Sequence, residues 1–572
     1  MTTSAWRVFK DEAVGDEGMV AGKHPLAVRA GLDALRRGGN AVDAAVTMAF
    51  TLAVVEPQSS GLGGGGFVVI HEARSGREVA IDYAMDAPLA AGPDAYELDE
   101  GVGASSYGWR KVKGEANVLG YRAASVPGMV RGLALALERH GTISLAEALA
   151  PAIRCAEEGA EVLWQVALRI AMSMRDLARF PASAAVFLPG GFPPRPWGNA
   201  TPADRLVQPD LARTLRLIAV EGPDAFYAGE IARAIARAMR EHDGLITEED
   251  LARYRPTVTE GGLATDYRGH RIVGVPGACG SVTLQQGLAI LEGYDLAALG
   301  HGSVAATHLQ AEAFRLAFAD RYRYVADPKQ VAVPWAGLLS PDYAAERRAL
   351  IDPARAAATV EAGDPWRFDG GAPAPAGAAV REGSPPSSTT TLAIVDRDRN
   401  VVSLTQTLVN AFGCGVVVPG TGVLLNNAMS WFDPRPGQPN SAAPGKRGLN
   451  NMAPLIVLRD GLPLLATGAV GGRKIIQAVA QVVSNVLDFG LGMQDAVGAP
   501  RIDCSGPAVL VDARDPPSLP AALAALGHTV EVREESFHAY HFATPVGIAI
   551  DPATGRLHSG VDPFRLSEAA GY

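Results

Sequence analysis

The sequence changes from loop to strand within one short stretch, Ser387-Ser388-Thr389-Thr390-Thr391-Leu392-Ala393-Ile394-Val395-Asp396. Upstream, residues 369–388 are rich in Gly, Ala, Pro and Ser, a composition typical of an exposed segment at which a chain is easily cut. Downstream, a β-branched apolar run ends in a polar turn at 396–400, and a second run of the same kind covers 401–408. The pattern predicts a β-hairpin that begins at the threonines.

Thr389 has chemical potential at this junction. If the bond between Ser388 and Thr389 were cut, Thr389 would carry a free α-amine, which titrates near about 8, beside its own hydroxyl. A threonine hydroxyl activated by the amine of its own chain is a known type of nucleophile. The preference of Thr for strands explains the same residues without any chemistry. The local pattern favours this plainer explanation, so the rest of the chain must decide.

Composition defines the broad class of protein. The chain has 572 residues, 48% apolar and 20% charged, which is enough apolar material for several domains or for one large layered sandwich. The formal net charge of −10 argues against nucleic acid as the main partner. The first residues contain no apolar leader, and the longest apolar run, 42–55, is too short to cross a bilayer. We therefore expect a cytoplasmic protein that does not use a membrane.

Cysteine and histidine spacing predicts neither a metal site nor a cofactor. The four cysteines lie far apart, and the eleven histidines include no H-E-x-x-H pair. The glycine run at 61–66 lacks the Lys-Ser/Thr of a P-loop and precedes a strand, so we expect it to allow close backbone packing under a site. Nucleotide binding is thereby disfavoured.

Helical and irregular segments divide the large N-terminal part. An amphipathic helix is expected from Pro25 until Gly38-Gly39, and Asn40 is placed to cap a buried apolar helix that follows. Residues 128–250 are mostly helical in pattern. Residues 95–125 are expected to be irregular, and 325–388 to resemble a linker.

A second candidate site is a glycine turn between a strand and a helix. Strands are expected at 455–458 and 463–467, and the chain then passes through Gly471 and Gly472 into a helix that begins at Arg473. Backbone N–H groups at such a helix N-terminus can hold an oxyanion. A simple packing turn would explain the glycines equally well.

Several motifs in order resemble the γ-glutamyltranspeptidase (glutathione hydrolase) family of N-terminal-nucleophile hydrolases. They are Gly38-Gly39-Asn40-Ala41-Val42-Asp43-Ala44-Ala45-Val46, Leu62-Gly63-Gly64-Gly65-Gly66-Phe67, Val126-Pro127-Gly128, residues 244–254, Leu424-Leu425-Asn426-Asn427, Pro444-Gly445-Lys446-Arg447, Met452-Ala453-Pro454 and Gly471-Gly472. The similarity extends from about Gly18 to Tyr572, and it reverses the preference for the plainer explanation of Thr389.

The resemblance implies a fold and a mechanism. The fold would be an α+β four-layer α/β/β/α sandwich. The precursor would cut itself into a large chain, 1–388, and a small chain, 389–572, that stay together as one domain, and a homodimer of these is possible. Thr389 would be nucleophile and base, Thr407 would support it, and Gly471 and Gly472 would form the oxyanion hole. An acyl group would pass from a small-molecule amide to Thr389 and then to water or an amine.

The departures from the family pattern fall where a γ-glutamyl group would be recognised. The family usually has an Arg for the substrate α-carboxylate where Ala84 stands, and an Asp for the α-ammonium where Trp431 stands. Asn450-Asn451 replace a Ser-Ser pair, and Val409 replaces an Asn, although Asn410 is adjacent. A zwitterion in such a pocket would lack both partners, at a cost of several kcal/mol.

We therefore expect an amide hydrolase with an acyl group other than γ-glutamyl, similar to the oxamate amidohydrolase-like and cephalosporin acylase-like branches. Residues 431–437 resemble these branches more than true transpeptidases. The expected substrate-binding residues are Trp431, Asn450, Asn451, Asn410 and, as a source of positive charge, Arg473 or Arg110. An alternative for Arg473 is a solvated position at a helix start.

Three alternatives remain open at this stage. The first is a γ-glutamyltransferase or glutathione hydrolase that binds the zwitterion with other residues. The second is a catalytically inactive scaffold or binding relative. The third is a transferase that uses an amine acceptor. The sequence also leaves open whether the loop at 433–445 closes over the site.

Overall fold

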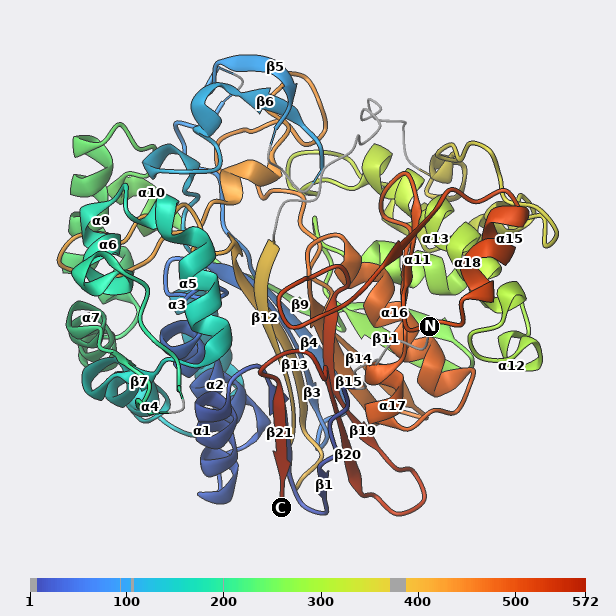
Figure 1. Ribbon diagram of the computed structural model, residues 1–572, viewed down its shortest axis with the longest axis horizontal. Coiled ribbons are helices and arrows are strands. Elements are labelled where there is room, and N and C mark those ends of the chain that lie inside the picture. The colour runs from blue at the N-terminus through green and yellow to red at the C-terminus, as the bar shows by residue number, and fades with distance from the viewer. Residues whose placement is uncertain (1–7, 93, 104–106, 199, 371–386) are drawn as a thin grey trace.

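Two antiparallel sheets lie face to face between two helical layers in the computed structural model, which describes residues 8–92, 94–103, 107–198, 200–370 and 387–572. Figure 1 shows the two sheets in the centre, with α1, α2 and α3 on one side and α11, α13 and α16 on the other. This is the predicted α+β four-layer α/β/β/α sandwich. Apolar clusters fill each of the three spaces between the layers.

We call the sheet that carries Thr389 the nucleophile sheet. Its strands, in spatial order, are β21 (Glu568–Gly571), β2 (Met19–Gly22), β12 (Ser387–Val395), β13 (Val401–Asn410), β3 (Gly65–Glu72), β4 (Arg77–Tyr83) and β9 (Thr257–Glu260). The facing sheet has the order β1 (Val14–Gly15), β20 (Leu557–Val561), β19 (Thr544–Ile550), β15 (Leu462–Val470), β14 (Leu455–Arg459), β11 (His270–Gly274) and β10 (Leu263–Tyr267). The predicted hairpin is therefore β12–β13, and it lies in the middle of its sheet.

The helices on the nucleophile sheet form the first half of the chain. They are α1 (Pro25–Arg36), α2 (Ala41–Val55), α3 (Met129–His140), α4 (Leu145–Glu158), α5 (Trp164–Leu177), α6 (Pro181–Phe187), α7 (Pro209–Glu221), α8 (Asp224–Tyr227), α9 (Glu230–Glu241) and α10 (Glu248–Arg253). Asn40 caps α2 as predicted, since its Oδ1 accepts from the backbone N–H groups of Val42 and Asp43. All residues of α2 are buried, which explains its apolar sequence.

The helices that accompany the facing sheet come later in the chain. They are α11 (Ser281–Leu291), α12 (Leu296–Leu299), α13 (Val304–Tyr324), α14 (Trp335–Leu338), α15 (Pro341–Arg348), α16 (Lys474–Leu487), α17 (Met493–Gly498) and α18 (Ser518–Ala525). Small sheets complete the fold: β5 (Leu98–Val102) with β6 (Arg110–Val112), β7 (Ala160–Glu161) with β8 (Arg205–Leu206), and β16 (Ile502–Asp503), β17 (Val509–Asp512) and β18 (Val530–Arg533).

Two segments differ from the expectation. The region 95–125 contains the β5–β6 hairpin rather than only irregular chain. The segment from 325 contains α14 and α15, and Leu338 and Tyr343 pack into the apolar core, so only part of it is linker-like. Much of the remaining predicted linker, 371–386, lies outside the described residues. No helix within the described ranges combines the length and the hydropathy needed to cross a membrane.

Candidate active site

Thr389 lies near the beginning of β12, where the pairing with β13 is irregular. Ser388 pairs with Val409 and Thr389 pairs with Thr407, so Leu408 is an extra residue between them. The N–H of Leu408 turns away and donates to the carbonyl of Ser59. Val409 has φ of +86°, a backbone conformation that a β-branched residue rarely adopts. The bond between Ser388 and Thr389 is therefore opposite a strained bulge.

The hydroxyl of Thr407 connects both sides of this bond. Thr389 Oγ1 donates to Thr407 Oγ1 at 3.1 Å, and Thr407 Oγ1 donates to the carbonyl oxygen of Ser388 at 2.6 Å. The N–H of Val409 donates to the same Thr407 oxygen at 2.8 Å. The hydroxyls of Thr389 and Thr407 and the carbonyl of Ser388 therefore form one short chain of hydrogen bonds. The structure thus brings Thr389 and Thr407 together as predicted from the sequence.

The glycine turn faces the same space. Gly471 and Gly472 connect β15 to α16 with φ of +141° and +65°, values that favour glycine. A Cβ on Gly471 would lie 2.7 Å from Cα of Ala543, so the turn also requires glycine for space. Gly471 lines one cavity together with Thr389. The glycines are therefore at a helix N-terminus next to the candidate nucleophile, where free N–H groups can stabilise negative charge.

The glycine run at 61–66, which was predicted to allow close backbone packing, lies against β13. A Cβ on Gly64 would lie 2.3 Å from the carbonyl oxygen of Thr407. The backbone of β3 and of the preceding loop therefore approaches β13 more closely than any side chain allows. This contact fixes β13, and with it Thr407, relative to β3.

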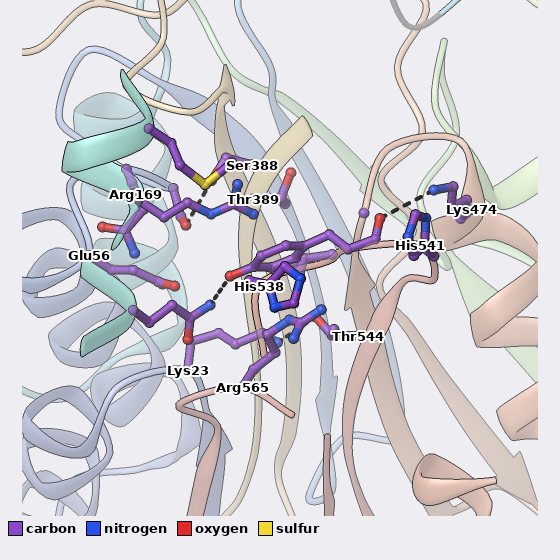
Figure 2. A pocket seen from close by; sticks show the side chains of 17 residues that line it. Lys23, Glu56, Arg169, Ser388, Thr389, Lys474, His538, His541, Thr544 and Arg565 are labelled. Atoms are coloured by element: carbon purple, nitrogen blue, oxygen red, sulfur yellow. Dashed lines mark hydrogen bonds between the residues drawn. The ribbon is translucent and has the colours of Figure 1, made fainter. Parts of the chain in front are cut away.

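The cavity beside Thr389 has a volume of about 300 Å³. Figure 2 shows that its walls come from both halves of the chain, with Glu56 and Arg169 on one side and Lys474 and His541 on the other. Its charged and titratable lining residues are Lys23, Glu56, Arg169, Lys474, His538, Tyr540, His541 and Arg565. The lining thus contains more cationic than anionic groups.

Burial shifts the pKa of four of these groups, Lys23, Glu56, Lys474 and His541, and the shifts of Glu56 and Lys23 are the large ones. Desolvation raises the pKa of the Glu56 carboxyl to about 7, and Lys23 and Arg169 oppose that rise through their positive charge. Desolvation lowers the pKa of the Lys23 ammonium to about 8, while Asp562 and Glu56 oppose that change. The charge of the cavity therefore varies across the neutral pH range.

The predicted recognition residues do not line this cavity, although Trp431 shares an apolar cluster with Val409, the residue opposite Ser388. Trp431, at the end of the short helix η5 (Ala428–Trp431), is buried in the apolar cluster between the sheets, together with Ala84. Asn450 donates its amide to the carbonyl of Ala278 at 3.0 Å, and Asn451 Oδ1 accepts from Arg321 at 3.2 Å. None of Trp431, Asn450 and Asn451 is among the residues that line the cavity.

The other predicted substrate-binding residues are also outside the cavity lining. Arg473 is only 5% exposed and its charge acts on Asp503 and Tyr322, so the solvated alternative is wrong. Arg110 is exposed on β6, where its Nε donates to the carbonyl of Asp99. Asn410 ends β13, and its backbone N–H donates to Asn427 Oδ1 at 3.0 Å. Their predicted roles in substrate binding stay predictions.

The loop at 433–445 is anchored to the body of the protein. Asp433 pairs with Arg435, and Asn440 donates its amide to the carbonyl of Val325 at 3.0 Å. Directly after the loop, Arg447 forms ion pairs with Asp82 at 2.6 Å and Asp86 at 2.8 Å. The family-like motif that contains Arg447 therefore fixes this loop against β4.

Sequence reasoning missed the charged lining of the cavity. Glu56 stands just before the glycine run, but Arg169 comes from α5 and Tyr540 from a segment near the C-terminus. These residues are far apart in the chain and follow no short motif. Their only signal was their residue type, which is common on any surface.

The structure combines a four-layer sandwich, a threonine at the start of a central strand and a glycine turn that faces this threonine. This combination defines the class of N-terminal-nucleophile hydrolases. A family model described as gamma-glutamyltranspeptidase matches residues 27–572. The chain belongs to the γ-glutamyltranspeptidase family. It is accordingly an amidohydrolase or acyltransferase of the N-terminal-nucleophile type, as the sequence predicted.

Both acylases and glutathione hydrolases are among the proteins similar to this chain. The chain is 42% identical to the Acylase ACY 1 proenzyme of Pseudomonas sp. (strain SE83), over 91% of this chain and 88% of the relative. It is 38% identical to the glutathione hydrolase proenzyme of Bacillus subtilis (strain 168), over 86% and 82%. The crystal structure of cephalosporin acylase from Bacillus halodurans superposes with a TM-score of 0.86 at 31% identity, covering 100% of this chain and 99% of that one.

Proposed function

We propose that this protein is a self-processing acylase: it cuts its own chain before Thr389 and then hydrolyses small-molecule amides whose acyl group is not γ-glutamyl. The hydrogen-bond chain from Thr389 through Thr407 to the carbonyl of Ser388 carries this proposal. The word proenzyme in the names of the acylase and glutathione hydrolase relatives agrees with it.

Processing begins at the Ser388–Thr389 peptide bond. Thr389 Oγ1 adds to the carbonyl carbon of Ser388, and Thr407 donates a hydrogen bond to the oxygen on which negative charge develops. The C–N bond then breaks and its nitrogen takes up the proton that Oγ1 loses, which leaves Ser388 esterified to Thr389. Water hydrolyses this ester, and the products are the Ser388 carboxylate and a free amine on Thr389.

Turnover uses the same hydroxyl with a new base. The free amine of Thr389 accepts the proton of Oγ1 as this oxygen attacks the carbonyl of the substrate amide. The backbone N–H groups at Gly471 and Gly472 stabilise the oxyanion, the leaving amine takes the proton, and water then releases the acyl group from Thr389. Hydrolysis rather than transfer is our choice because the similar proteins are named acylase and glutathione hydrolase.

The position of Ala84 supports an acyl group other than γ-glutamyl. Ala84 and Trp431 belong to one buried apolar cluster, which also contains Tyr107 and Trp109. A γ-glutamyl zwitterion placed there would find neither the Arg nor the Asp that the family usually supplies. Unpaired charges in such surroundings cost several kcal/mol.

The experiment compares the purified wild-type chain with Thr389→Ala and Thr389→Ser. The wild type and the serine variant should yield a fragment that begins at residue 389, whereas the alanine variant should stay intact and inactive. Turnover of acyl p-nitroanilides should follow the same order, and γ-glutamyl-p-nitroanilide should be a poor substrate. Processing of the alanine variant would refute the nucleophile. Efficient γ-glutamyl turnover would favour the glutathione hydrolase alternative.

A further inference from the structure

Ser59, in the turn that follows α2, contacts both strands of the hairpin beside the Ser388–Thr389 bond. It is 5% exposed, and its Oγ lies 3.0 Å from Oγ of Ser388 in β12. Its carbonyl oxygen accepts from the N–H of Leu408, the extra residue of the bulge in β13, at 3.3 Å. One residue of the helical layer therefore holds the strained bulge and the acyl side of the bond that it faces.

Ser59 is itself fixed in place. Its backbone N–H donates to the carbonyl of Glu56 at 2.9 Å. Desolvation raises the pKa of the Glu56 carboxyl to about 7, and the hydroxyls of Thr390 and Ser59 oppose that rise. A serine hydroxyl has one proton, so Ser59 donates to Glu56 when that carboxyl is ionised and then accepts from Ser388. The hydroxyl of Ser59 is thus held from two sides.

The contact with Ser59 adds a second fixed point to the peptide group that reacts in processing. Thr407 Oγ1 donates to the carbonyl oxygen of Ser388 at 2.6 Å. A contact at the oxygen alone lets the carbonyl group turn about that oxygen. The contact between the hydroxyls of Ser388 and Ser59 limits this rotation, because it holds the side chain of the same residue. Orientation matters here, since a small misplacement of reacting atoms costs a large factor in rate.

We propose that Ser59 is a positioning residue for self-processing: its hydroxyl holds Ser388 so that the carbonyl carbon of Ser388 faces Thr389 Oγ1. The proposal rests on the proposed function, because it requires the cut before Thr389. Once the Ser388–Thr389 bond is broken, Ser388 is no longer joined to the nucleophile. The contribution of the Ser59 hydroxyl therefore belongs to the processing step and not to turnover.

The test follows newly translated chains in a cell-free system and measures how fast the fragment that begins at Thr389 appears. Ser59→Ala and Ser388→Ala should each lower the first-order rate constant about 10-fold, because each removes the same hydrogen bond. The double variant should be no slower than either single variant, since both substitutions act through one contact. Ser60→Ala is the control, because Ser60 is also buried but its hydroxyl accepts from Gln406.

Three results of this measurement would overturn the proposal. They are equal rates in the wild type and Ser59→Ala, an equal loss of rate in the Ser60→Ala control, and a double variant in which the two losses multiply to about 100-fold.

Turnover by the matured chains separates positioning from a general distortion of the fold. Prolonged incubation should yield matured Ser59→Ala, whose kcat on an acyl p-nitroanilide should fall by a much smaller factor than its processing rate. An equal loss in both rates would indicate distortion and contradict the role of Ser59. Chains that are cut at the expected relative rates but hydrolyse no acyl amide would instead contradict the proposed acylase function alone.

Discussion

The hydroxyl of Thr407 has a single proton, and that proton is committed to the carbonyl of Ser388. Thr389 must therefore donate to Thr407 and cannot receive a hydrogen bond from it. This arrangement polarises the carbonyl that is attacked and orients the attacking oxygen at the same time. After cleavage the Ser388 carbonyl leaves, and the hydroxyl of Thr407 is free to donate to Thr389. Under the proposed function, one residue would thus serve processing and turnover in two different hydrogen-bonding states.

Glu56 should make the binding of an anionic substrate depend on pH. Its pKa is raised to about 7, so it is neutral below pH 7 and negative above it. Lys23 loses its proton near pH 8. Asp562 and Arg565 also act on Lys23. His541, whose pKa burial lowers, has already lost its charge at lower pH. The net positive charge of the cavity therefore falls further as Glu56 ionises near pH 7, and KM for an anionic substrate such as glutaryl-p-nitroanilide should rise several-fold between pH 6 and 8.

Glu56→Gln should remove the step near pH 7 and leave any step near pH 8. Initial-rate kinetics across this pH range measure both, and pentanoyl-p-nitroanilide serves as the uncharged control. An unchanged pH profile in the variant would show that Glu56 does not influence substrate binding.

The proposed reacting residues could be singled out from the sequence, but the residues around them could not. Thr389, Thr407 and the glycine turn were accessible because each belongs to a short segment with its own pattern and family resemblance. Arg169 and Tyr540 were not, because they meet only after α5 and the C-terminal segment pack together. Glu56 stood beside a recognised glycine run, but its unusual titration comes from burial, which no local pattern reveals.

At the scale of elements, the cap of α2 is a sensitive point. Asn40 Oδ1 accepts from the first turn of α2, and its amide donates to the carbonyl of His140 at 2.7 Å. Asn40→Ala should lower stability by about 1 kcal/mol. The measurement is the urea midpoint of the uncut Thr389→Ala chain. Asn40→Ser, which can still cap the helix, is the control, and an equal midpoint for the serine and alanine variants would contradict the capping role.

Elements with strong local patterns were predictable, and others were not. The β12–β13 hairpin and the helices α1, α2 and α16 follow from periodicity and from their start and stop signals. The bulge at Leu408 was not predictable, because it depends on the contact between β13 and Ser59, which is far away in the sequence. The strands β19, β20 and β21 are short and gain their stability mainly from neighbours in the sheets.

At the scale of the whole molecule, both proposed chains are interleaved. In the nucleophile sheet, β12 and β13 lie between β2 and β3, and in the facing sheet β14 pairs with β11. A cut before Thr389 leaves all of these pairings intact. The processed protein should therefore elute as one particle in size-exclusion chromatography and separate only in denaturant. Separation of the two chains in native buffer would contradict this prediction.

The central claim is that Thr389 becomes the N-terminal residue and nucleophile. The most direct measurement is the intact mass of freshly purified wild-type protein, together with N-terminal sequencing of the smaller chain. We predict two chains, residues 1–388 and 389–572, with the second beginning Thr-Thr-Thr-Leu. A single chain of the full 59.5 kDa that stays uncut on prolonged incubation would contradict it.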